Sequence, residues 1–200
     1  MRISKEKILG GFSIIEVVIA IAILAMASVA PLSLSQKGLR SSVYARDQVT
    51  AFYLAQEAIE YVRYVRDNNS LAGLSQSENW LTGLENCISP SICGIDVNAI
   101  VSERTYSCAN DHPANGVTMD CLLTYNPNTG IYGDQRDGSG NPISPAENTL
   151  FKRKVTITQS AIGSDPHAAG DISVTVSWQT GSISQSVVVK EKIYDWYPKP

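Results

Sequence analysis

The chain has 200 residues, of which 44% are hydrophobic and 18% are charged, and its formal net charge at pH 7 is −3. This length is sufficient for one compact domain together with one long accessory element. The small negative charge gives no bulk attraction to nucleic acid or to acidic lipid, so no nucleic acid is expected among the partners of the protein.

The first element expected is a membrane-spanning helix over residues 12–31. From Phe12 to Ala30 the sequence contains 19 residues whose only charge is Glu16. A helix of that length rises about 28 Å, which is just enough to cross the hydrocarbon core of a bilayer. The segment is therefore interpreted as a single transmembrane pass.

The residues before this segment indicate its orientation. They include Arg2, Lys5 and Lys7 against a single acid, Glu6. Because positive charge stays on the cytoplasmic side, the N-terminus is expected in the cytoplasm and the residues after Ala30 outside the inner (cytoplasmic) membrane.

A secretory signal peptide and a plain membrane anchor are two general explanations for these first 30 residues. Residues 25–30 (AMASVA) would supply the cleavage site of a signal peptide. However, Glu16 lies within the apolar core, and Pro31 follows the best cleavage position, where it hinders the peptidase. A plain anchor has no use for Glu16 either, because a carboxylate at depth costs about 2.5–3.5 kcal/mol on insertion scales.

A third explanation accounts for the glutamate. Residues 10–16 read GGFSIIE and resemble the processing site of type IV prepilins and of type II secretion pseudopilins. The resemblance implies that a prepilin peptidase cuts between Gly11 and Phe12 and methylates the new N-terminus, which makes residues 1–11 a leader. Cleavage creates an α-amino cation at Phe12, and this cation can compensate Glu16 of an adjacent subunit in the low dielectric of the membrane.

The resemblance also implies the partners of the protein and where it is found. The expected partners are the prepilin peptidase, other pilin subunits, the inner-membrane assembly platform and, before assembly, membrane lipid. The protein is expected first as a single-pass prepilin in the inner membrane and then in an extracellular filament.

A helix break is expected after the apolar segment, at Pro31 and Gly38. Proline removes a backbone donor and clashes with the preceding turn, so the helix should kink or loosen near Ala27–Pro31. Similar pilins keep a helix breaker at about this place, where the helix melts in assembled filaments. The sequence does not separate a kink from melting, and a simple helix end at the membrane surface is a further alternative.

An amphipathic helix is predicted over residues 32–69 because apolar residues recur at spacings of three and four. This stripe is expected to pack on the sheet that follows, and residues 54–68 (LAQEAIEYVRYVRDN) resemble the corresponding helix of pilus-modification-type minor pilins and of secretion pseudopilins. The stripe consists of Leu39, Val43, Ala51, Leu54, Ala58, Val62 and Val65.

Residues 70–149 are expected to be a loop-rich disulfide region. All four cysteines, Cys87, Cys93, Cys108 and Cys121, lie beyond the membrane segment on the side predicted to be oxidising. Their spacing lacks the CxxC pairs of a zinc site, so disulfides are predicted and no metal or other cofactor is expected. Of the three possible connectivities, the nearest-neighbour pairing Cys87–Cys93 and Cys108–Cys121 is favoured.

Strands are predicted in the rest of the chain. A hairpin joins residues 122–125 to residues 131–132 through a turn that contains Pro and Gly. Apolar and polar residues then alternate over 150–159 and 172–178, and a further strand covers 183–194. These three strands predict an antiparallel sheet over residues 150–200 that covers the helix stripe on one face. The expected fold class is α+β and pilin-like, with a long N-terminal helix packed on a C-terminal antiparallel sheet.

The sequence indicates a structural protein. It contains no recognisable nucleophile–base pair, glycine-rich phosphate loop or acid pair, so no enzyme activity and no catalytic residue are expected. The favoured function is a subunit, most simply a minor pilin, of a type IV pilus or related filament, although the sequence does not separate minor from major pilins. The alternatives are a type II secretion pseudopilin and a membrane-anchored adhesin or binding module that does not polymerise.

Overall fold

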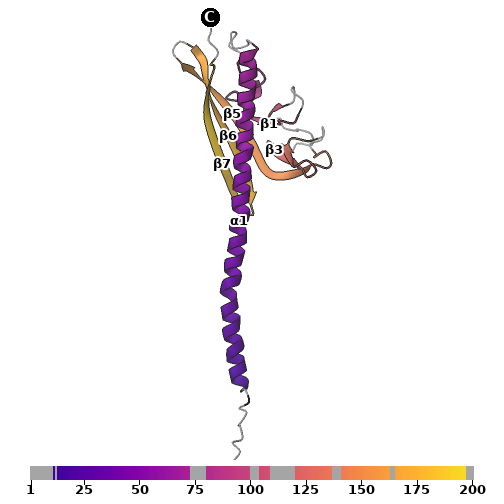
Figure 1. Cartoon of the computed structure of the whole chain (residues 1–200), viewed down its shortest axis with the longest axis vertical. Coiled ribbons are helices and arrows are strands. Elements are labelled where there is room, and N and C mark those ends of the chain that lie inside the picture. Colours follow the sequence, from indigo (N-terminus) through magenta and orange to yellow (C-terminus); the bar gives the residue numbers. More distant parts are fainter. Residues whose placement is uncertain are drawn as a thin grey trace, which may run out of the picture. The chain divides into compact units, whose positions relative to one another are not determined.

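A computed structural model of the chain describes residues 11, 13–72, 80–99, 104–108, 120–136, 141–162 and 165–196. These residues form one long N-terminal helix followed by an antiparallel sheet, which confirms the predicted α+β fold class (Figure 1). The chain divides into two units, residues 1–46 and residues 47–200. The helix α1 (Ile14–Leu71) contributes to both units.

In the first unit, α1 begins where the carbonyl of Ser13 accepts hydrogen bonds from the backbone N–H groups of Glu16 and Val17, at 3.0 and 3.2 Å. The backbone remains helical through Pro31 and Gly38, the two positions at which the sequence predicts a break. In the turn before Pro31, the hydroxyl of Ser28 donates to the carbonyl of Leu24 at 2.8 Å. Such side-chain bonding to the i−4 carbonyl slightly weakens a helix.

In the second unit, one face of α1 is buried against the sheet. Ala51, Leu54, Ala58 and Val62 are each at most 5% exposed, as the helical stripe predicts. The stripe was also expected to include Leu39 and Val43, but these residues lie in the first unit and are 67% and 42% exposed. The buried stripe therefore begins after residue 46.

The sheet is built around two long strands, β5 (Glu147–Ile162) and β6 (Asp165–Thr180). Strand β7 (Ile183–Tyr194) pairs with β6 alone. On its other edge, β5 pairs with β3 (Leu122–Asn126) and with β1 (Cys93–Ile95), which continue to β4 (Ile131–Gly133) and to β2 (Thr105–Ser107). All pairings between the described strands are antiparallel.

The sheet contains the hairpin that the sequence predicts and a second one. Strands β3 and β4 pair Tyr125 with Tyr132. Strands β6 and β7 are joined by a two-residue turn between the paired residues Thr180 and Ile183. Gly181 has a φ of 65° in this turn, the conformation that a glycine supplies at the first position of a two-residue hairpin loop.

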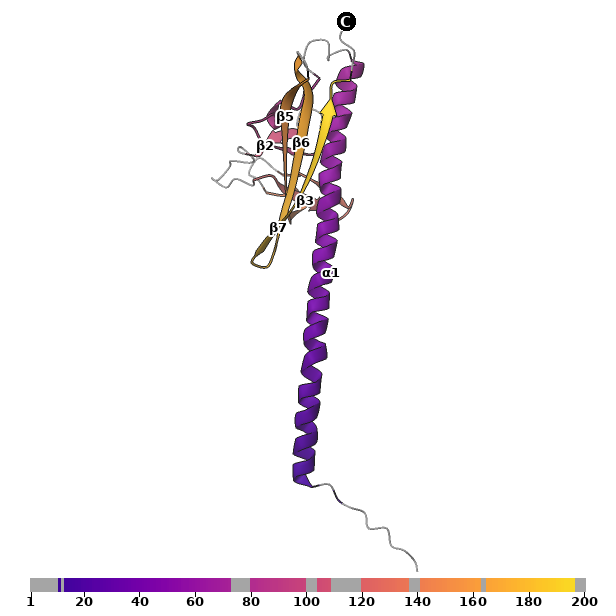
Figure 2. The ribbon, with the colours of Figure 1, turned by 90° about the vertical axis from the view of Figure 1, so that its left-hand side faces the viewer.

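Side-chain alternation along the strands forms the core of the second unit. Figure 2 shows strands β5, β6 and β7 lying side by side. From Ile172 to Trp178, alternate residues of β6 are buried, as the period of two predicts. Gly170 allows the close approach of Trp80, because a Cβ at this position would lie 3.3 Å from the Trp80 ring. The largest fully buried apolar side chains contributed by the sheet and the segment before it are Trp80, Leu84, Ile95, Leu123, Val155, Ile157, Ile172, Val174, Val176 and Ile193.

Candidate functional site

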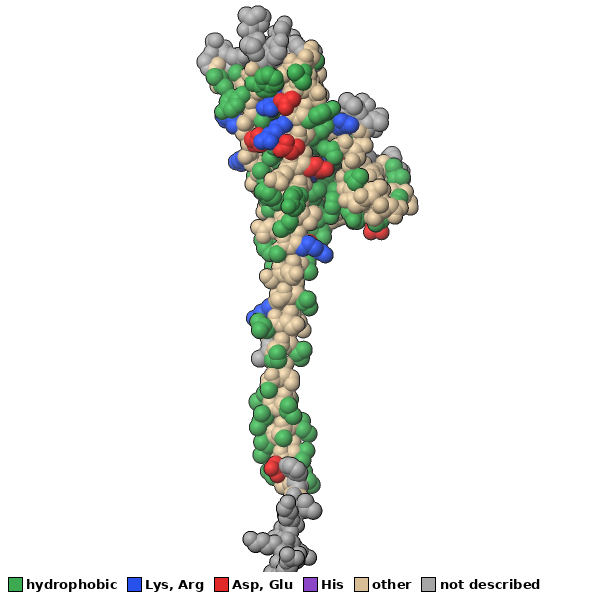
Figure 3. Space-filling view, in the orientation of Figure 1, with side chains coloured by type: hydrophobic (Ala, Val, Ile, Leu, Met, Phe, Trp, Pro, Cys, Tyr) green, Lys and Arg blue, Asp and Glu red, His purple; other side chains and the backbone are tan. Residues whose placement is uncertain are grey.

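The first candidate site is the N-terminal part of α1, where the side chains are apolar and exposed. Ile14 is 86% exposed and Leu34 is 72% exposed, and none of the described side chains between them is buried. Figure 3 shows hydrophobic side chains gathered around this part of the helix on the face in view. By length and composition this helix can cross a membrane.

Glu16 is the only acidic residue of this segment, and it lies in the first turn of α1. A carboxylate is favoured in this turn because the helix dipole places partial positive charge at the N-terminus. Gly11 has open space around its Cα, since a Cβ built there would meet no atom within 4 Å. Phe12, the residue predicted to follow the cleavage site and to pair with Glu16, lies outside the described residues.

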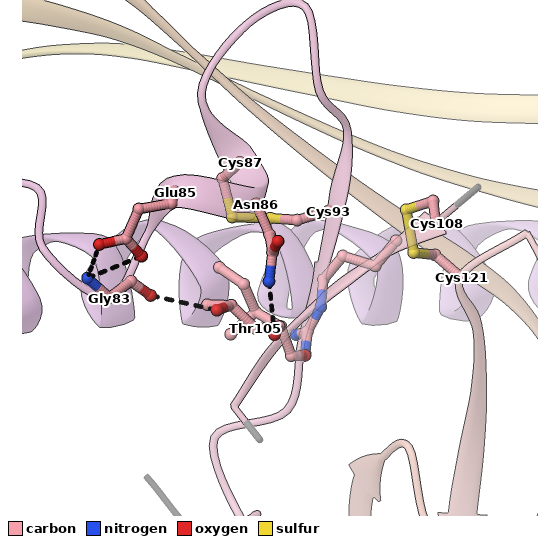
Figure 4. The surroundings of a disulfide bond; sticks show 10 residues. Gly83, Glu85, Asn86, Cys87, Cys93, Thr105, Cys108 and Cys121 are labelled. Atoms are coloured by element: carbon pink, nitrogen blue, oxygen red, sulfur yellow. Dashed lines mark hydrogen bonds between the residues drawn. A yellow bond between two sulfur atoms is a disulfide. The ribbon is translucent and has the colours of Figure 1, made fainter. Parts of the chain in front are cut away.

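The disulfides belong to the second unit and form the nearest-neighbour pairs that the sequence favours (Figure 4). Cys87, at the end of the 3₁₀ helix η2 (Glu85–Cys87), is bonded to Cys93 at the start of β1, with 4.7 Å between the Cα atoms. Cys108 follows β2 and is bonded to Cys121, just before β3, with a Cα–Cα distance of 5.1 Å. All four cysteines are at most 5% exposed.

Hydrogen bonds reinforce the region around the first disulfide (Figure 4). The side-chain amide of Asn86 donates to the carbonyl of Thr105 at 3.1 Å, and the hydroxyl of Thr105 donates to the carbonyl of Gly83 at 3.1 Å. The backbone N–H of Gly83 donates to the Glu85 carboxylate at 2.9 Å. These contacts connect η2 to β2, so the short elements of the loop-rich region are joined to the sheet covalently and by hydrogen bonds.

Asp120 connects the second disulfide to the central strand. It has a φ of 52° and precedes Cys121, and its carboxylate forms ion pairs with Lys152, at 3.3 Å, and Lys154 of β5. Burial opposes ionisation of Asp120, but the hydrogen bonds and charges of Lys154 and Lys152 outweigh it and hold the pKa of this carboxyl below its usual value.

Sequence reasoning did not identify Arg153, which is fully buried between β5 and α1. Its Nη1 donates to the carbonyl of Leu54 at 3.0 Å and forms an ion pair with Glu57, and its Nη2 donates to the carbonyl of Ile95. The alternation along the strand predicts that residue 153 is buried, because Phe151 and Val155, two residues away on either side, are buried.

A second connection joins the end of α1 to the last strand. Arg63 forms ion pairs with Glu191 of β7 and, at 2.7 Å, with Glu60. The hydrogen bond from Arg66 holds the pKa of Asp67 below its usual value, and the Trp196 indole N–H also donates to Asp67, at 3.4 Å.

Metal binding has no evident site in the part of the chain that the structure describes, where no group of three or more His, Cys, Asp and Glu side chains is placed to hold an ion. Comparisons with protein-family models, with curated proteins and with solved structures find no match. The features of this chain that bear on its function are therefore the N-terminal motif and the geometry of each unit.

Proposed function

We propose that this chain is a structural subunit, of the minor-pilin kind, of a type IV pilus or related extracellular filament. The observation that carries the proposal is an exposed apolar helix with one carboxylate, Glu16, in its first turn. In the proposed mechanism, a prepilin peptidase cuts between Gly11 and Phe12, and the mature helix first spans the membrane and then packs among other subunits.

Apolar exposure is the first support for this proposal. Burying one large aliphatic side chain is worth about 1.5–3 kcal/mol, so the segment requires a cover of lipid or protein along its whole length. The exposed large apolar residues of the segment are Ile14, Ile15, Val17, Val18, Ile19, Ile21, Ile23, Leu24, Met26, Val29, Leu32 and Leu34.

Glu16 is the second support, because a carboxylate is unfavourable inside such a cover unless it has a partner of opposite charge. Cleavage before Phe12 would provide that partner as a new α-amino group, four residues before Glu16 in the sequence. The pairing of a neighbouring subunit's amine with Glu16 can then align the two helices. This interaction is made between subunits, so it serves assembly and not the fold of the second unit.

The second unit supports export. Its two disulfides require an oxidising compartment, which in the proposed topology lies beyond the membrane on the side opposite to the leader cations. The unit has its own buried core and can therefore present its surface on a filament.

N-terminal sequencing of the membrane-bound protein, together with mass spectrometry of sheared filaments, tests the proposal. We expect a mature, methylated N-terminus at Phe12. We also expect peptides of this chain in the filament fraction. A protein that begins at Met1, Ser28 or Pro31 would refute the processing step. A protein that begins at Phe12 but stays out of every filament would be a non-polymerising anchor.

A further inference from the structure

A short cationic segment of α1 follows the apolar segment. From Val17 to Arg46 the sequence contains three cations, Lys37, Arg40 and Arg46, and no acid. All three side chains are exposed. The segment therefore has a local positive charge, although the net charge of the chain is −3.

Lys37 and Arg40 form a pair on the helix surface. They are three residues apart, which places them on the same face of an α-helix with their Cβ atoms about 5–6 Å from each other. No carboxylate of the described residues pairs with either of them. The pair is therefore available to an anionic group from outside the chain.

The depth of these residues indicates the source of that group. At about 1.5 Å per residue, Lys37 lies about 4.5 Å and Arg40 about 9 Å beyond Leu34, the last exposed aliphatic residue before the two cations. The polar layer on each side of a bilayer is roughly 5–8 Å thick, and long cationic side chains can reach back toward it. Arg46 lies about 18 Å beyond Leu34, outside this layer.

We propose that Lys37 and Arg40 bind the phosphate groups of anionic phospholipids on the exported side of the membrane while the subunit waits there for assembly. The inference rests on the membrane insertion that the proposed function requires. It assigns to this turn of α1 a role in fixing the depth of the helix, because the two cations remain at the phosphates while the apolar side chains remain in the hydrocarbon. Extraction into a filament must then break these contacts.

Spin-labelled lipid provides the test. The full chain and its variants are placed in phosphatidylcholine nanodiscs that contain spin-labelled phosphatidylglycerol or spin-labelled phosphatidylcholine, and the motionally restricted fraction gives the relative association constant. Each of Lys37→Gln and Arg40→Gln should lower the constant for phosphatidylglycerol by roughly fivefold and leave that for phosphatidylcholine unchanged. Raising the salt concentration to about 1 M should weaken the preference of the parent, because the Debye length falls to about 3 Å.

Arg46→Gln is the matched control, because it removes the same charge from the same helix outside the headgroup layer. It should keep the lipid preference of the parent. The leader cations are common to all variants, so the comparison isolates the exported side. Near-ultraviolet circular dichroism should show an unchanged second unit, since the altered side chains are exposed in the first unit.

The outcomes separate this inference from the proposed function. A Lys37→Gln/Arg40→Gln protein with the parental lipid preference overturns the inference, as does an equal loss in Arg46→Gln. If that double variant keeps its lipid preference but disappears from sheared filaments, the cations pair with carboxylates of a neighbouring subunit instead of lipid. A double variant that loses the preference, in a chain whose parent never enters filaments, supports the lipid site and refutes the filament.

Discussion

Arg153 of β5 and Glu57 of α1 form an ion pair that connects the centre of the sheet to the helix across the core of the second unit. The guanidinium is fully buried, whereas the Glu57 side chain keeps 36% of its exposure. The cation also donates to the carbonyls of Leu54 and Ile95. The arginine therefore depends on the pair more than the glutamate does.

This asymmetry predicts that removing the acid lowers the free energy of unfolding more than removing the base does. Glu57→Gln leaves a buried cation with carbonyl partners only, and it should lower the free energy of unfolding by about 1–3 kcal/mol. Arg153→Met replaces the cation by an apolar side chain and leaves a carboxylate that water can reach, so it should change stability by less than Glu57→Gln. Urea unfolding of the full chain in detergent, followed by near-ultraviolet circular dichroism, measures both.

The double variant gives the control. In an Arg153→Met background, Glu57→Gln should be nearly neutral, because no buried cation is left to compensate. Glu60→Gln removes a carboxylate that is 65% exposed in its ion pair with Arg63, and it should change stability by less than about 1 kcal/mol. Equal losses in Glu57→Gln and Glu60→Gln would contradict the role of the buried pair.

The disulfides should contribute separately to stability. Cys87–Cys93 closes a loop with a sequence separation of 6, and Cys108–Cys121 closes one of 13. The chain-entropy model gives about 2–3 kcal/mol for loops of these lengths, so replacing either pair by alanine should lower the free energy of unfolding by that amount.

Non-reducing peptide mapping checks the chemistry before the stability is compared. Protein collected from the cell surface should give the two cross-linked peptides, each within one chain. Four free thiols would contradict an oxidising location, and a crossed pairing would refute the connectivity alone.

Acid should weaken the link between Asp120 and β5. A carboxyl whose pKa is lowered in the folded state stabilises the fold above its unfolded pKa of about 3.9, and this contribution is lost as the pH falls through the lower folded value. Asp120→Asn should therefore lose less stability than the parent on acidification below about pH 4. Urea midpoints measured across this range give the comparison.

Lys154→Gln tests the cause of the pKa shift of Asp120. It removes the hydrogen bond that lowers the pKa of Asp120 most, so the stability of the variant should depend less on acid pH, as in Asp120→Asn. A parallel acid dependence in the parent, Lys154→Gln and Asp120→Asn proteins would show that the ion pair does not stabilise the folded state.

Periodicity predicts the parts of this fold in which one face is buried. The alternation in β6 and the stripe at Ala51, Leu54 and Ala58 identify the core because burial repeats with the period of the backbone. The same stripe fails at Leu39, where an apolar residue at the right spacing is 67% exposed. The spacing of apolar residues predicts which face of the helix is apolar, but it does not predict where along the helix the contact with the sheet begins.

Other features depend on contacts that are distant in the sequence. Strands β1 and β2 lie in a stretch expected to be loop, and each is only three residues long, too short to show a period. The alternation along β5 places residue 153 in the core, whereas the charge of an arginine favours an exposed position. The partners of Arg153 are Leu54, 99 residues away, and Ile95, 58 residues away, so no local pattern predicts that it is satisfied.

Glu16 provides the last prediction, that it serves assembly and not folding, insertion or cleavage. It lies in the first unit, whereas the core of the second unit is formed by residues from Ala51 onward. Glu16→Val should therefore leave the disulfides and the unfolding of the second unit unchanged, and it makes the apolar segment easier to insert. What it removes is the charge partner of a neighbour's Phe12 amine.

Glu16→Val protein should accumulate in the inner membrane with its leader removed and be at least tenfold depleted from sheared filaments, since about 1.4 kcal/mol per contact suffices for a factor of ten. Glu16→Asp keeps the charge but shortens its reach by one methylene, so it should be intermediate. Quantitative mass spectrometry of the membrane and filament fractions measures both. Normal incorporation of Glu16→Val would mean that the carboxylate is not the assembly contact, and that the subunit is held by its apolar surface alone.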